Sequence, residues 1–212
     1  MAFVATVAIV LAACEPRAER TGSRGAGTGA AIPAAPAGVQ TPPATTVGSG
    51  PAVSREALRE RLIAAGLGVL KEPVQMDDFE LASIAGGTAK LSSFRGRLVF
   101  LNFWATWCPP CRAEMPSMER LYRRLRAKGL EVVGVDLQES KAEVQKFVKE
   151  RSLSFTVLLD TTGDVGGSWG AQSIPTTYLI DRSGGVFARA VGGREWDSDE
   201  MIALFEALLA AE

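Results

Sequence analysis

The sequence has 212 residues, enough for one domain of ordinary size with extensions. Lysine and arginine total 23 against 24 aspartates and glutamates, so no overall field would draw the chain to nucleic acid, which is not an expected partner. Histidine is absent, which excludes Ser-His-Asp and Cys-His catalysis and removes the commonest metal ligand; any chemistry must run on thiols, carboxylates and the backbone.

The chain opens on an apolar run, MAFVATVAIVLAAC, that ends at Cys14. Residues 2–13 would span about 18 Å as a helix, which is too short for a bilayer core of about 30 Å but suits the apolar region of a signal peptide. Leu11-Ala12-Ala13-Cys14 resembles the bacterial lipobox, in which the cysteine is joined to diacylglycerol and becomes the new N-terminus. We expect residues 1–14 to be a lipoprotein signal peptide, with Cys14 as the lipidation site.

One feature departs from the lipobox pattern. No lysine or arginine precedes Cys14, the first being Arg17, and this places the start of the chain in question. The alternatives are an uncleaved anchor or a chance apolar N-terminus.

Residues 15–53 consist mainly of Ala, Gly, Pro, Thr and Ser and contain no aromatic residue. Such a segment cannot bury enough apolar surface to offset the entropy of ordering it, so we expect a disordered tether. As a flexible coil it would hold the domain roughly 35 Å from its anchor. Residues 54–72 are expected to form a short helix, with Leu58, Leu62 and Ile63 on one side, and a connection.

The compact domain is expected over residues 73–212, where strand and helix patterns alternate. In chain order, the predicted elements are a hairpin of 79–81 and 90–91 around Gly86 and Gly87, a buried strand at 97–104, a helix at 111–128, a strand at 130–136, a helix from the Ser140/Glu143 capping box to about 151, strands at 155–159, 177–180 and 186–191, and a last helix capped by Asp197 or Ser198. Alternating βαβ followed by an antiparallel hairpin predicts an α/β fold, with a mixed central sheet and helices on both faces.

Two of the three cysteines stand in the sequence Cys108-Pro109-Pro110-Cys111. A structural disulfide usually joins distant segments, because closing a longer loop removes more entropy from the unfolded chain; a bond across two residues indicates one that is made and broken. A C-x-x-C that follows a strand and opens a helix, beside a βαβ unit, is typical of a thioredoxin-like redox site. The helix N-terminus favours a thiolate at Cys108. We expect Cys108 to be the nucleophile and Cys111, one turn deeper, to be the resolving thiol.

The prolines sharpen this interpretation. Pro109 and Pro110 suit the first helical positions but remove N–H groups that could have bonded the Cys108 thiolate, so we expect a more reducing couple. Pro175 stands before a predicted strand. A random X-Pro bond is cis in only about 5–6% of cases, so the residues alone predict a trans bond there.

Residues 102–116, NFWATWCPPCRAEMP, and residues 173–181, SIPTTYLID, together resemble the TlpA/ResA-like thiol-disulfide oxidoreductases. These are membrane-tethered thioredoxin-fold proteins of the bacterial cell envelope. The resemblance covers residues 73–212 and not the tether. It implies a thioredoxin-like fold with an N-terminal hairpin and a central strand-helix insertion.

The resemblance also implies roles for individual residues. Cys108 and Cys111 would be the redox pair, and the bond before Pro175 would be cis, facing the pair where the backbone can receive an extended substrate segment. Glu114 matches an acidic residue that tunes thiol ionisation, although on the residues alone it is a solvated first-turn carboxylate. Asn102 takes the place of a buried aspartate of ordinary thioredoxin, which makes Glu114 the candidate for proton transfer.

The expected substrate-contacting residues surround the cysteine pair in the sequence and in the predicted fold. They are Trp107, Pro109, Pro110, Ile174, Pro175 and Thr176. Trp104 and Trp107 would shield the sulfurs and offer an apolar platform for partners, although packing alone would also explain Trp104.

The leading interpretation is an exported protein-disulfide reductase, lipid-anchored on the extracytoplasmic side of a membrane and needing no cofactor or metal. The resemblance suggests client proteins with disulfides, such as apocytochrome c or copper-site assembly proteins, and re-reduction by a transmembrane thiol electron donor. The direction depends on the partner's potential, so an oxidase or isomerase stays open.

Two other functions fit the residues less well. A peroxidase of the peroxiredoxin type needs a threonine three residues before its cysteine, where this chain has Ala105. A non-catalytic binding lipoprotein or Cu(I) carrier would use the two thiolates alone, because the histidine ligand of copper carriers with this fold is missing.

Overall fold

The computed structural model describes residues 53–211. The predicted signal peptide, Cys14 and all but the last residue of the predicted tether lie outside the described residues. No helix within residues 53–211 combines the length and the apolar character needed to cross a membrane.

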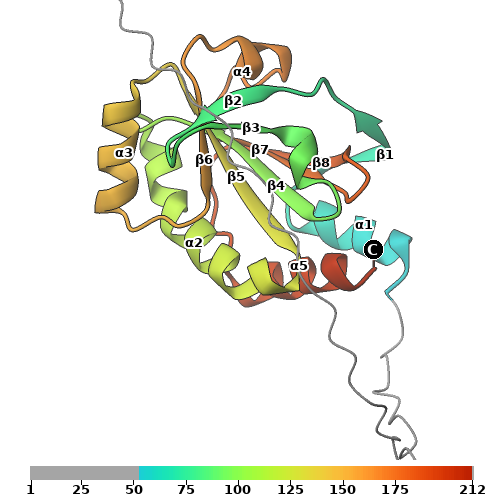
Figure 1. Cartoon of the computed structure of the whole chain (residues 1–212). Helices are drawn as coiled ribbons and strands as arrows, with labels where there is room; N and C mark the ends of the chain where they lie inside the picture. Colours follow the sequence, from blue (N-terminus) through green and yellow to red (C-terminus); the bar gives the residue numbers. More distant parts are fainter. Residues whose placement is uncertain (1–52, 212) are drawn as a thin grey trace, which may run out of the picture. The chain divides into compact units, whose positions relative to one another are not determined.

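The described residues form an eight-stranded sheet in the order β1-β8-β7-β4-β5-β6-β2-β3 (Figure 1). The strands are β1 (Gly68–Gln75), β2 (Glu80–Ser83), β3 (Thr88–Lys90), β4 (Leu98–Trp104), β5 (Leu130–Leu137), β6 (Thr156–Asp160), β7 (Thr176–Ile180) and β8 (Gly185–Val191). The helices are α1 (Arg55–Ala64), α2 (Pro109–Leu125), α3 (Lys141–Glu150), α4 (Asp164–Ser168) and α5 (Asp199–Ala211), with 3₁₀ turns η1 (Leu91–Phe94) and η2 (Arg126–Lys128).

Strand β4 lies at the centre of the sheet, and its C-terminal end leads into the cysteine motif. It runs parallel to β5 and antiparallel to β7, so the sheet is mixed, as expected. All seven residues of β4 are buried, which matches a strand covered on both faces. Its last residue, Trp104, pairs with Asp136 of β5, and Phe103 pairs with Thr176 at the start of β7. The end of β4 and the start of β7 therefore meet.

The two faces of the sheet have separate cores. One core contains residues of α1, α2, α3 and α5, with side chains such as Met115, Phe147 and Phe205 packed on the sheet. The other is built around Trp169, just after α4, and Phe103, and η1 packs against it. The predicted thioredoxin-like α/β fold, with helices on both faces, is confirmed.

The helix ends follow the signals in the sequence. Ser140 and Glu143 form the predicted capping box of α3. Gly129, with φ of 106°, ends the α2/η2 segment in the left-handed conformation that glycine tolerates best. Ser198, and not Asp197, caps α5, because its Oγ accepts the Met201 N–H at 3.2 Å.

The structure differs from the sequence prediction before residue 73. The expected connection is largely strand β1, an edge strand paired with β8, so the predicted boundary at residue 73 falls inside a strand. The sequence concealed it because Lys71, Glu72 and Pro73 break any alternating pattern, and the register slips between Val69 and Val74. In α1, Leu58 and Leu62 are buried but Ile63 is 52% exposed, so the predicted apolar side is narrower than expected.

Candidate active site

Cys108 and Cys111 form a disulfide just beyond the C-terminal end of β4. Cys108 is the N-cap of α2, and Cys111 lies in its first turn, with 5.3 Å between the Cα atoms. Cys108 is 3% exposed and Cys111 is fully buried. The outer and inner positions predicted for the two sulfurs are those that the structure shows.

The sulfur of Cys108 receives one helix N–H. As an N-cap side chain it would be bonded from the second or third helical residue. The third is Cys111, whose N–H donates to Cys108 Sγ at 3.3 Å. The second is Pro110, which has no N–H to give. Pro110 is therefore the position at which a donor to the thiolate is missing.

Replacing Pro110 with alanine is expected to raise the reduction potential of the pair. The restored N–H would stabilise the Cys108 thiolate, and so the reduced state, by about 1.5–3 kcal/mol, or roughly 30–60 mV for a two-electron couple. Equilibration with glutathione buffers measures it. Pro109→Ala is the control, because the first helical N–H does not reach the N-cap side chain; equal shifts in both variants would contradict this account.

The loop before β7 faces the cysteines. The Ile174–Pro175 bond is cis, as the family resemblance implied and the residues alone did not. The Ile174 carbonyl oxygen lies 3.7 Å from Cys108 Sγ. A hydrogen bond joins this loop to the residue after β8, because the Pro175 carbonyl accepts the Gly192 N–H at 2.8 Å.

The surface around the sulfurs is partly apolar. Trp107 is 66% exposed and Val191 is 52% exposed. Pro109 and Pro110 are exposed and Ile174 is half-buried, so these predicted contact residues can reach a partner.

Two of the predicted contact residues, Pro175 and Thr176, are buried, and so is Trp104, which was expected to form part of an apolar platform. Thr176 is buried, and its hydroxyl donates to the Ser173 carbonyl at 2.6 Å, so its side chain serves the loop itself. Trp104 is fully buried against Phe147, which corrects the expectation that it offers a platform for partners.

Glu114 is buried in α2, three residues after Cys111, and only 2% exposed. The reading from the residues alone, a solvated carboxylate, is therefore wrong. Its Oε1 accepts from Asn102 Nδ2 at 2.9 Å, and its Oε2 accepts from Trp196 Nε1 at 3.0 Å and the Arg194 N–H at 3.3 Å. Burial raises the pKa of Glu114 above its ordinary value, and these hydrogen bonds oppose the rise.

Arg194 and Trp196 were not found by sequence reasoning. They follow Glu114 by 80 and 82 residues, and no local pattern joins them to it. The guanidinium of Arg194 lies 5.2 Å from the Trp196 ring centroid and donates to the Ala65 carbonyl at the end of α1. The one signal in the sequence is Trp196 itself, which stands alone outside any apolar pattern. A buried indole N–H usually has a hydrogen-bond partner, so such a tryptophan indicates a polar partner elsewhere in the chain.

A cleft opens beside Glu114. Its volume is about 280 Å³, and it is lined by Pro110, Ala113, Glu114, Pro116, Ser117, Arg120, Gly193, Arg194 and Glu195. Gly193 packs tightly there, because a Cβ would lie 2.9 Å from the Pro110 carbonyl oxygen. The cleft lies next to the redox motif and has Glu114 in its wall.

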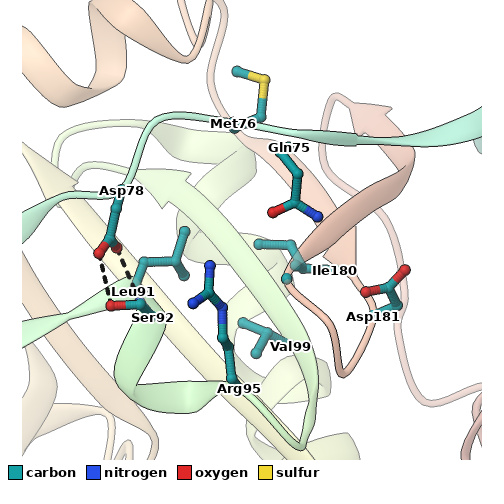
Figure 2. A pocket seen from close by; sticks show the side chains of 10 residues that line it. Gln75, Met76, Asp78, Leu91, Ser92, Arg95, Val99, Ile180 and Asp181 are labelled. Carbon is teal, nitrogen blue, oxygen red and sulfur yellow. Dashed lines mark hydrogen bonds between the residues drawn. The ribbon is translucent and has the colours of Figure 1, made fainter.

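A second cavity lies at the opposite end of the sheet, where β4 begins and β7 ends (Figure 2). Its volume is about 30 Å³, much smaller than that of the cleft beside Glu114. Asp78 at its wall accepts from the N–H and hydroxyl of Ser92, at 2.9 and 2.6 Å. The Asp78 contacts join the connection between β1 and β2 to η1, and the cavity contains none of the predicted site residues.

No cluster of three or more Cys, Asp or Glu side chains suited to a metal ion is present within residues 53–211. The cysteine pair would offer two soft ligands when reduced. The bonded cysteine pair at the start of α2 supports thiol-disulfide exchange directly.

Comparisons with known proteins agree with this geometry. The family model described as AhpC/TSA matches residues 74–189. The thiol-disulfide oxidoreductase ResA of Bacillus thuringiensis is 39% identical over 115 residues, 54% of this chain and 66% of its own length. ResA of Halalkalibacterium halodurans is 36% identical over 138 residues, 65% of this chain and 77% of its own. ResA of Geobacillus thermodenitrificans is 41% identical over 51% of this chain, which spans 63% of that relative.

Solved structures show the same fold. A thiol:disulfide interchange protein of the thioredoxin family from Chlorobium tepidum is 26% identical, with a TM-score of 0.57, over 68% of this chain and 99% of its own. A secreted thiol-disulfide isomerase from Corynebacterium glutamicum is 25% identical, with a TM-score of 0.61, over 69% of this chain and 92% of its own.

Proposed function

The chain belongs to the AhpC/TSA family and, within it, to the ResA-like thiol-disulfide oxidoreductases, and from this membership we propose that it reduces disulfides of client proteins in the cell envelope. The observation that carries the proposal is the Cys108–Cys111 disulfide at the start of α2, facing the loop before β7. The bonded pair is the product state of the cycle that follows.

In the reduced protein, the Cys108 thiolate attacks one sulfur of a client disulfide. A bond forms between Cys108 and that sulfur, the client bond breaks, and the released client thiolate takes up a proton. Cys111 then gives up its proton and attacks Cys108 Sγ; the bond between Cys108 and the client sulfur breaks, the internal disulfide re-forms, and the second client thiolate leaves and takes up a proton. Two electrons pass from the protein to the client. Of the two protons that the client gains, one balances the proton lost by Cys111, and the other comes from the solvent because Cys108 starts as a thiolate.

Glu114 is the proposed acceptor of the Cys111 proton. The two residues are three apart on one helix and so share a face, and both are buried. Burial raises the pKa of Glu114 while three donors and the nearby Arg194 guanidinium oppose the rise. A carboxyl held between these influences can carry a proton in one step and lose it in the next.

The finer parts of the proposal concern place and partners. Cys14 would carry the lipid anchor, and residues 15–53 would let the domain reach its partners from the extracytoplasmic membrane face. Client disulfides, apocytochrome c among them, would dock on the exposed Trp107, Pro109 and Pro110, on the half-buried Ile174 and on the backbone around Pro175. A transmembrane thiol carrier would return the electrons.

Insulin reduction in dithiothreitol tests the activity. We expect the full chain to accelerate insulin precipitation over dithiothreitol alone, and to show no peroxide turnover, because Ala105 offers no hydroxyl at the position where a peroxidase needs threonine. Failure to accelerate would indicate a binding protein and not a catalyst. Rapid acid quenching of cells, followed by alkylation of thiols, reports the direction: a mostly dithiol pool supports a reductase, and a mostly disulfide pool an oxidase.

A further inference from the structure

Asp136 is a buried carboxyl that the proposed cycle does not use. It is the residue of β5 that pairs with Trp104, the last residue of β4. It is fully buried, and within the described part of the chain neither carboxyl oxygen has a hydrogen-bond donor. An aspartate that is shielded from bulk solvent and has no hydrogen-bonded donor is costly as an anion, so burial here favours the protonated form.

The neighbour that can accept this proton is Glu139, on the loop before α3. Burial raises the pKa of Asp136 to about 9, and the adjacent Glu139 side chain contributes to the rise. The Glu139 and Glu143 carboxyls also raise the pKa of Asp136, and the smallest of these influences, the Glu139 backbone N–H, opposes the rise without reaching hydrogen-bond geometry with either carboxyl oxygen. A protonated carboxyl is a donor, and a carboxylate beside it is its natural acceptor.

Glu139 also holds the turn that leads to Cys108. Its Oε2 accepts the Thr106 backbone N–H at 2.5 Å, and its Oε1 accepts the Thr106 hydroxyl. Thr106 lies two residues before Cys108, whose own N–H donates to the Ala105 carbonyl at 3.3 Å. One carboxylate thus fixes both the backbone and the side chain of the residue in the middle of this turn.

We propose that Asp136 and Glu139 share one proton and act together as positioning residues for the turn that presents Trp107 and Cys108. With the proton in place, Asp136 donates to Glu139, and Glu139 keeps both contacts with Thr106. Without it, two adjacent anions repel in a buried site, Glu139 moves away and Thr106 is released. The catalytic consequence rests on the proposed function, whereas the shared proton and its effect on Thr106 do not.

The test uses the full chain labelled with ¹³C, with the Asp136 carboxyl and the Thr106 Cβ followed against pH. Asp136→Asn is the informative variant, because its amide can donate to Glu139 at every pH and cannot ionise. Asp136→Ala removes the donor. The matched control is Asp160→Asn, at a second buried aspartate at the end of β6, whose oxygens already accept the Gly163 and Gly166 N–H groups at 3.1 and 2.7 Å.

We expect the Asp136 carboxyl to titrate near pH 9 and the Thr106 signal to follow it in the wild type but not in Asp136→Asn. Disulfide reduction by Asp136→Asn should equal that of the wild type at pH 7 and exceed it increasingly above pH 9. Asp136→Ala should be slower at pH 7, by roughly tenfold, as misplacement of a reacting group allows. Asp160→Asn should keep a constant ratio to the wild type.

An Asp136 carboxyl that titrates in the ordinary acidic range, or a Thr106 signal that ignores its titration, would overturn the proposal. If the wild type reduces no disulfide while both signals titrate together near pH 9, the proposed function fails and the shared proton stands.

Discussion

Replacing Cys111 with serine is expected to stop disulfide exchange halfway. Cys108 remains at the N-terminus of α2 and can still attack a client disulfide, but no inner thiol is left to release the client. The mixed species should accumulate as a dithiothreitol-sensitive adduct, visible by mass spectrometry. Turnover should fall on the order of 10³-fold or more, as for the loss of a member of a catalytic unit.

The reciprocal variant separates the two roles. Cys108→Ser should form no adduct, because Cys111 is fully buried behind Cys108. Both variants are best made in a Cys14→Ser background, so that the remaining cysteine of the pair is the only thiol that can form the adduct. Adduct formation through Cys111 in Cys108→Ser would reverse the assignment of nucleophile and resolving thiol.

Replacing Glu114 with glutamine is expected to slow release of the client while leaving the first attack intact. Glutamine cannot take the Cys111 proton, and positioned acid–base groups typically contribute about 10²–10⁴-fold. Rapid-mixing measurements with a peptide disulfide should show normal formation of the mixed disulfide and slow decay. If formation and decay of the mixed disulfide slow to the same extent, Glu114 supports the structure and does not move a proton.

Stability should change with pH in the same variant. Because the pKa of Glu114 is raised in the folded protein, the folded state keeps a proton that the unfolded chain loses as pH rises above its ordinary value of 4.5. The wild type therefore loses stability as pH rises through the window between the unfolded and folded pKa values. Glu114→Gln lacks this loss, so its stability relative to the wild type should improve with pH across that window in denaturant titrations.

Glu119→Gln provides the matched control for both measurements. Glu119 lies on the same helix, is 6% exposed, and accepts the Ser154 N–H and hydroxyl at 2.7 and 2.6 Å, away from the cysteines. It should cost stability through these lost contacts without slowing decay of the mixed disulfide. If both variants slow that decay equally, the effect is not specific to Glu114.

The sequence was most informative where one local pattern decides the outcome. A buried strand followed by a cysteine, two prolines and a second cysteine places the pair at a helix start, because proline at the first helical positions and the dipole act within one turn. The Ser140/Glu143 capping box is equally local. These elements could be predicted without knowledge of the remainder of the chain.

The site beyond the cysteines could not be read in this way. Glu114 was assigned a role only by resemblance, because its burial depends on Trp196 and Arg194, which the fold brings from 80 or more residues away. The contact of Glu139 with Thr106 spans 33 residues and joins two loops. Such contacts follow from the pairing of β4 with its neighbours, and single-residue patterns do not encode them.

Strand β1 also bears on how copies of this protein behave when crowded together. The unpaired backbone groups of an edge strand can pair with a strand of another chain. In β1, however, Lys71 and Glu72 are charged, Pro73 lacks an N–H donor, and the register with β8 is irregular. Each of these makes continued strand addition unfavourable. The β1 edge is therefore poorly suited to pairing with the same edge of a second copy.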